Sequence, residues 1–269
     1  MKFGRLPRGH DPRIPKMATL RAIGATPPLP DPVDYSTGMP ANLGMMMNDQ
    51  LGDCTAAACG HAMQVWSFNS QPPMVTPSDG DVEKLYEATG GYVPGQPNTD
   101  NGAIEQVVLQ YWLNNPLASN QLAAFVEVDV KNLDEVKRAI WECGVVYIGL
   151  NVPAFLQNLE APGSNWATKP GVDNEIIGGH AVTVVGWDPR QNFILISWGA
   201  VYTMTPSFWL GFVDEAYALA NPAWMEKTGR SPAGLSLARL QKAMASMMEI
   251  PKPQEHRHHR RKKQWNPPT

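Results

Sequence analysis

Proline is concentrated at the start of the chain and limits what that part can fold into. Within residues 1–44 it occupies Pro7, Pro12, Pro15, Pro27, Pro28, Pro30, Pro32 and Pro40. Each proline lacks a backbone N–H and has a fixed φ, so a long helix or a central strand cannot form here. We therefore expect residues 1–44 to form an extended arm, not a domain of their own.

The next part of the chain has the pattern of helices. Alanines and a Met, Val and Trp stripe predict a helix over residues 55–66, with Cys54 in its first turn. Apolar positions at helical spacing predict two more helices, over 78–89 and 103–113. A strand over 124–128 then precedes a helix over 132–141. Asn132 is the expected cap at the start of this helix, with Glu135 at its third position.

Strands dominate the second half. An apolar run predicts a buried strand over 145–150, and two further runs, 181–187 and 192–199, flank a turn and predict a hairpin. Residues 208–220 are expected to be helical in part, and 235–248 form an amphipathic helix. Helices early and strands late indicate an α+β fold. We expect an arm (1–44), a central domain (45–225) and a helix with a basic tail (226–269).

Charge is distributed unevenly along the 269 residues. Residues 1–30 and 251–269 each carry a net charge of +5, although the whole chain carries −3. Basic ends on an acidic body are typical of contacts with nucleic acid or with neighbouring chains, so Arg257, Arg260, Arg261, Lys262 and Lys263 are candidates for nucleic-acid contact. No apolar run is long enough for a membrane span or a secretion signal, and we expect neither membrane contact nor signal-directed secretion.

Two residues are candidates for nucleophilic chemistry. Three cysteines, Cys54, Cys59 and Cys143, are too few and odd in number for a disulfide framework. A cysteine at a helix start has unpaired N–H groups beside its sulfur, which favours the thiolate. His180 opens the first strand of the hairpin, where its ring can face that helix. No set of residues has the spacing of a metal site or a phosphate loop, so no cofactor is expected.

Three short blocks carry a family resemblance. They are Asn48-Asp49-Gln50-Leu51-Gly52-Asp53-Cys54, Gly179-His180-Ala181-Val182, and Ser197-Trp198-Gly199. Their order and separation resemble the papain-like cysteine peptidase superfamily, and the chain looks most like its small members encoded by phages and prophages. The resemblance implies a helix that bears the nucleophile, packed against a C-terminal antiparallel sheet or barrel. It also implies a protein or peptide substrate.

The resemblance implies roles for particular residues. Cys54 would attack a carbonyl carbon and His180 would carry the proton, while Trp198 would shield the histidine from water. The oxyanion would be held by the Cys54 N–H and by a side-chain amide, either Asn48 or Gln50. The family normally has an asparagine directly before Ser-Trp-Gly to orient the histidine, and this chain has Ile196, which can neither donate nor accept. The third catalytic residue is therefore not identified.

Three hypotheses follow for the function. The first is a thiol hydrolase that cleaves a peptide or other amide bond, phage-encoded and located in the host cytoplasm or the virion. The second is a structural capsid, portal or tail protein that keeps the fold, with its arms on neighbouring subunits or DNA. The third is an acyl or amide transferase. In an active enzyme Cys54 and His180 should meet at a cleft open to solvent, with a polar partner behind the imidazole.

Overall fold

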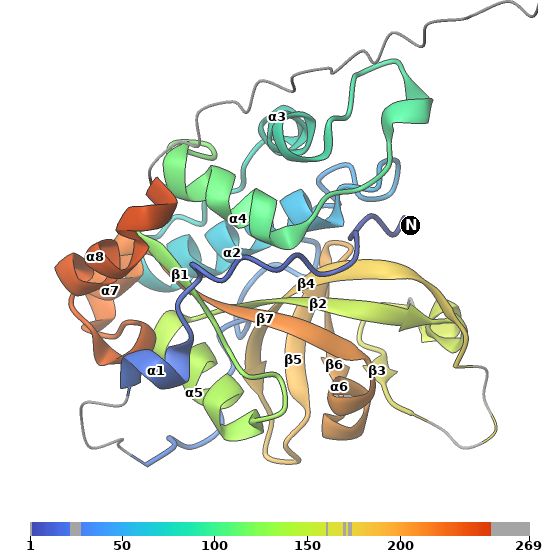
Figure 1. Cartoon of the computed structure of the whole chain (residues 1–269). Coiled ribbons are helices and arrows are strands. Elements are labelled where there is room, and N and C mark those ends of the chain that lie inside the picture. The colour runs from blue at the N-terminus through green and yellow to red at the C-terminus, as the bar shows by residue number, and fades with distance from the viewer. Residues whose placement is uncertain (1, 22–27, 160, 169–170, 172–173, 249–269) are drawn as a thin grey trace, which may run out of the picture.

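A seven-stranded sheet in the order β1-β7-β2-β4-β5-β6-β3 organises this computed structural model. Helices lie on both faces of the sheet, with α2, α3 and α4 together on one side (Figure 1). All strand pairs are antiparallel except β3 with β6. The structure describes residues 2–248 apart from 22–27, 160, 169–170 and 172–173. The predicted α+β class is confirmed.

The elements have the following bounds. The α-helices are α1 (Met17–Arg21), α2 (Cys54–Ser70), α3 (Asp79–Gly90), α4 (Glu105–Asn114), α5 (Leu133–Cys143), α6 (Pro206–Phe212), α7 (Pro222–Thr228) and α8 (Leu237–Met248). The strands are β1 (Ala124–Glu127), β2 (Val146–Pro153), β3 (Asn165–Trp166), β4 (Ile176–Trp187), β5 (Phe193–Ser197), β6 (Ala200–Met204) and β7 (Val213–Ala220). Each described helix is too short or too polar to cross a membrane.

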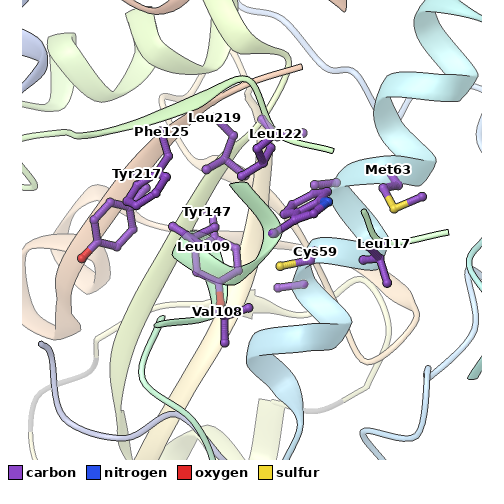
Figure 2. Close-up of a cluster of buried hydrophobic side chains, with 14 of the residues drawn as sticks. Cys59, Met63, Val108, Leu109, Leu117, Leu122, Phe125, Tyr147, Tyr217 and Leu219 are labelled. Carbon is purple, nitrogen blue, oxygen red and sulfur yellow. The ribbon is translucent and has the colours of Figure 1, made fainter. Parts of the chain in front are cut away.

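Both faces of the sheet are buried, because alternate strand residues enter two different cores. On β2, Tyr147 packs with α2 and α4, whereas Ile148 packs with α5 on the opposite face. Figure 2 shows the first core, where Cys59 of α2 and Leu109 of α4 meet side chains from β1, β2 and β7. The burial of apolar side chains in the first core holds α2 against the central strands.

Local signals in the sequence set several helix ends. Ser78 forms a reciprocal capping box with Asp81 at the start of α3, and Gly91 ends that helix in a left-handed conformation. Asn132 Oδ1 accepts a hydrogen bond from the Glu135 N–H at 3.1 Å, as predicted for α5. The hairpin is also confirmed, with β4 longer than expected.

Residues 208–220 are helical in part, as predicted, and their second half forms a strand that the sequence did not predict. α6 ends at Phe212, and Val213–Ala220 form β7, which lies between β1 and β2 in the sheet. Alanine favours helices intrinsically, but pairing on both sides with strongly apolar strands outweighs that preference here.

The expected arm packs closely on the central domain and contains a short helix, α1. It forms isolated bridges with β1 and β4, through Lys16 to Glu127 and Asp34 to Gly186, and with the residue pair before α4, through Arg5 to Ala103. The predicted C-terminal helix is confirmed as α8, whose Leu240 and Met244 are buried. The basic tail, with Arg257, Arg260, Arg261, Lys262 and Lys263, lies outside the described residues.

Candidate active site

Cys54 is the first residue of α2, and two buried hydrogen bonds place this end of the helix on the sheet. Thr183 Oγ1 donates to the Ala58 carbonyl at 2.7 Å, and the Tyr147 hydroxyl donates to the Thr55 carbonyl at 2.9 Å. The Cys54 Sγ accepts from the backbone N–H of Ala181 at 3.4 Å. The thiol therefore lies directly beside the residue that follows His180.

His180 projects from β4 and is held on two sides. Its Nε2 lies 2.8 Å from the Ser197 Oγ at the end of β5. The indole of Trp198 stacks on the imidazole, with ring centroids 4.6 Å apart and planes inclined by 19°. The other ring nitrogen, Nδ1, is buried and has no hydrogen-bond partner among the described residues. One nitrogen is thus anchored and the other is left for a reactant.

Ser197 is a hydrogen-bond partner of His180 that was not predicted from the sequence. The position directly before Ser-Trp-Gly is Ile196, which is buried in the core. β5 runs beside β4, and the next residue along the strand supplies its hydroxyl to the imidazole. A signal was available, because Ser197 is the first polar side chain after four apolar residues of this strand.

Residues 2–8, which we call the covering segment, lie across Cys54 and His180. The segment runs between the helical layer and the sheet (Figure 1). The Arg5 N–H donates to the Gly179 carbonyl at 3.0 Å, and Gly4 accepts from the Ala103 N–H at 2.8 Å. The Phe3 ring lies 5.8 Å from the His180 ring. Cys54 and His180 are each only 1% exposed, so the site is closed, not open as expected for an active enzyme.

Burial keeps both reactive groups neutral in this covered state. It raises the pKa of Cys54 to about 12, against the opposing effect of the Ala181 and Gly4 amides. It also lowers the pKa of His180 to about 3, and His61 adds to this effect. At pH 7 the pair is therefore a thiol and a neutral imidazole. A thiolate and imidazolium need the water that the covering segment excludes.

The two candidate oxyanion donors lie in different surroundings. The Asn48 side chain is buried, and its Nδ2 lies 3.2 Å from both the Leu51 carbonyl and Asp53 Oδ1. The same nitrogen also approaches the carbonyl oxygen of Lys2 in the covering segment, at 3.4 Å. Gln50 is exposed. Of the two amides, that of Asn48 faces a carbonyl group of the covering segment.

Other candidate chemistry is not assembled. Cys54, Cys59 and Cys143 are free and buried. Within the described part of the chain, no group of three or more His, Cys, Asp and Glu side chains is placed to hold a metal ion.

Known structures resemble this one, although two comparisons of its sequence find nothing. No family model matches it, and a search of curated proteins finds no match. Xylellain, a cysteine protease from Xylella fastidiosa, has a TM-score of 0.60 at 17% identity, covering 81% of this chain and 95% of its own. For bromelain from Ananas comosus in complex with the E64 inhibitor, the TM-score is 0.51 at 14% identity, with coverage of 71% and 99%. The chain therefore has the papain-like fold.

Proposed function

We propose that this chain is a thiol hydrolase in which Cys54 attacks the carbonyl carbon of a peptide or other amide bond. One observation carries the proposal: the Cys54 sulfur lies at a helix start and bonds the amide of Ala181, next in the chain to a histidine whose Nε2 is 2.8 Å from Ser197 Oγ. Its neighbours of known structure are cysteine proteases, which supports a peptide as substrate.

The chemistry follows from this arrangement. With Nε2–H donated to Ser197, His180 Nδ1 carries a lone pair that takes the thiol proton as Sγ bonds to the carbonyl carbon. The Cys54 N–H and Asn48 Nδ2 stabilise the oxyanion. Collapse breaks the C–N bond, and His180 returns the proton to the leaving amine. Water, deprotonated by the same histidine, then hydrolyses the thioester.

The test uses Gly4→Ala, because a methyl group at this position would overlap the Gly52 carbonyl group and displace the covering segment. We measure alkylation of Cys54 by iodoacetamide from pH 4 to 9, with and without His180→Ala. A thiolate–imidazolium pair predicts a rate that rises below pH 7, and an inflection that moves to about 8.5 without His180. An inflection near 8.5 in both variants would reject the hydrolase.

Ser197 is proposed as a positioning residue for His180. In the Gly4→Ala background, Ser197→Ala is expected to lower the alkylation rate at pH 6 by about tenfold, since the loss of one hydrogen bond costs about 1–1.5 kcal/mol. The inflection should also move toward 8.5. Ser70→Ala, which removes another buried hydroxyl at the far end of α2, serves as the control. Equal effects of both substitutions would assign Ser197 a purely structural role.

A second candidate function is supported by the burial of the pair. A protein that uses the fold only as a scaffold has no need of an accessible thiol, and Cys54 and His180 are both covered. The resemblance to phage-encoded members makes a structural virion protein the form of this alternative, with its basic ends on neighbouring subunits or nucleic acid. An inflection near 8.5 in both variants of the alkylation test would favour this role.

A further inference from the structure

Arg5 of the covering segment fills a pocket of carboxylates beside the candidate active site. Its side chain is 1% exposed, and its Nε donates to Glu215 Oε1 at 2.8 Å. Its Nη2 contacts the same oxygen at 2.5 Å and also bonds Asp214 Oδ1. Glu105 Oε1 lies 3.7 Å from Nε. The guanidinium is thus held by three acidic side chains from α4 and β7.

The pocket is built by the central domain, independently of Arg5. Glu215 Oε2 accepts from the Tyr217 hydroxyl at 2.7 Å, and that hydroxyl accepts from Gln106 Nε2 at 2.9 Å. Asn151 Nδ2 donates to Asp214 Oδ2 at 3.1 Å. These bonds orient two of the carboxylates before any cation arrives, as in a preformed binding site.

Glu105 brings to the pocket a buried carboxyl group that no hydrogen bond from a described residue satisfies. Both of its carboxylate oxygens are buried and lack a hydrogen-bond partner among the described residues. They lie above Gly149, where a Cβ would come within 2.6 Å of Glu105 Oε1 and would overlap Arg5 Nε. A glycine in β2 therefore leaves the space that the guanidinium occupies.

Charge in the pocket is unbalanced without the covering segment. Burial and the neighbouring Glu215 raise the pKa of Glu105, and the cations that oppose this are Arg5 and Arg8. Both arginines belong to the covering segment. Once the segment leaves, Glu105 and Glu215 share the site without either arginine, and a cation from elsewhere would bind there favourably.

The pocket also has a defined place relative to the candidate chemistry. The Gly4 amide lies close enough to Cys54 to lower the pKa of its thiol, and the side chain of the next residue, Arg5, enters the pocket. Phe3, on the other side of Gly4, contacts His180 and Trp198. Because the histidine gives its proton to the leaving amine, the Phe3 side receives the leaving group. The pocket is then on the acyl side.

We propose that the pocket of Glu105, Asp214 and Glu215 selects peptides with a basic side chain, arginine above lysine, on the acyl side of the scissile bond. This inference rests on the proposed hydrolase function. Arg5 occupies the pocket in place of that side chain. Arginine is favoured because Glu215 Oε1 takes two N–H groups of one guanidinium while Asp214 takes another, a geometry that a lysine ammonium cannot match.

The first experiment measures binding alone, in the full chain with Arg5→Ala. Ethylguanidinium replaces the atoms that this substitution removes, and ethylammonium tests the preference for the planar group. At ten times its Kd, ethylguanidinium should raise the Tm by about 2–4 °C. Ethylammonium at the same concentration should raise it less. The control is Arg13→Ala, which removes an exposed arginine paired with Asp11 and should show no response.

A second variant protects the test against failure to fold. Arg5→Ala with Glu105→Gln neutralises one buried carboxylate and keeps the two that form hydrogen bonds, so the same rise in Tm is expected. Adding Glu215→Gln to either variant should abolish it. No rise in either variant would overturn the pocket, whether or not the protein hydrolyses peptides.

The second experiment measures selectivity in Gly4→Ala with fluorogenic peptide amides. Two pairs of substrates differ only in arginine or leucine, at the last or the second-last residue before the scissile bond. In at least one of the two pairs, kcat/KM should be at least tenfold higher for the arginine substrate than for the leucine substrate. Glu215→Gln should remove this preference. Cleavage without preference would overturn the inference. Binding of ethylguanidinium without any cleavage would instead reject the hydrolase.

Discussion

Replacing Gly4 with alanine is expected to increase the alkylation rate of Cys54 by about a hundredfold at pH 8.5. In the folded protein a Cβ at this position would overlap the carbonyl group of Gly52, and backbone on that side cannot move aside as a flexible side chain could. The Gly4 carbonyl also touches Gly102, where another Cβ would collide with it. Overlap with backbone costs about 3 kcal/mol or more, which corresponds to about a hundredfold in the population of the open state.

The measurement is peptide mapping by mass spectrometry after timed exposure to iodoacetamide, so that Cys54 is distinguished from Cys59 and Cys143. Gly211→Ala is the matched control, since a Cβ there meets no atom within 4 Å. The choice of pH 8.5 makes the result independent of catalysis, because an ordinary exposed thiol also reacts there. If Cys54 labels at the parental rate in Gly4→Ala, the covering segment is not what protects it.

Asp53→Asn is expected to stabilise the protein, by an amount that grows with pH. Asp53 is fully buried, and its Oδ2 has no hydrogen-bond partner among the described residues. Burial raises the pKa of its carboxyl group to about 8. The folded chain therefore retains a proton that the unfolded chain releases near pH 4. The free energy of unfolding then falls by about 1.4 kcal/mol per unit as pH rises from about 4 to about 8.

Asparagine has the shape of the protonated carboxyl group and keeps an oxygen for Asn48 Nδ2. We expect equal stability of the two proteins at pH 4 and an advantage for the variant of up to about 4 kcal/mol at pH 7. Urea unfolding at pH 4, 5.5, 7 and 8 measures the difference. Asp49→Asn, the exposed neighbour, should show no comparable trend. A difference that stays constant across this range would show that Asp53 is ionised in the folded state.

Much of the fold could be predicted because local signals and tertiary contacts agree. The Asn132 cap, the hairpin of β4 and β5, and the start of α2 at Cys54 are each determined by a few neighbouring residues. β7 could not be predicted in this way. Its alanines have no strand preference of their own, and only the neighbouring strands β1 and β2 make that conformation favourable.

The candidate site shows the same limit. Cys54 and His180 were predicted from expected positions at element ends. Cys54 does begin α2, whereas His180 lies inside β4, and the Cys54 sulfur accepts a hydrogen bond from the amide of Ala181, the next residue along that strand. Ser197 was not predicted because the pairing of β4 with β5 decides which side chain of β5 reaches His180. That pairing includes an irregularity between Val184 and Gly186. The docking of Arg5 on Glu215 joins residues 210 positions apart, a separation at which no local pattern gives information.

The hydrogen bonds of the covering segment have a consequence for how fast such a protein can work. The amides of Arg5, Leu6 and Ala103 bond across the cleft, to Gly179, Ala103 and Gly4 respectively. All three must break together before anything can reach Cys54, and their exchange with deuterated solvent would report how often this happens. Turnover cannot be faster than this opening. The fraction of open molecules also scales the apparent affinity for any ligand, so in the proposed hydrolase a change of sequence in residues 2–8 would adjust the activity without altering Cys54 or His180.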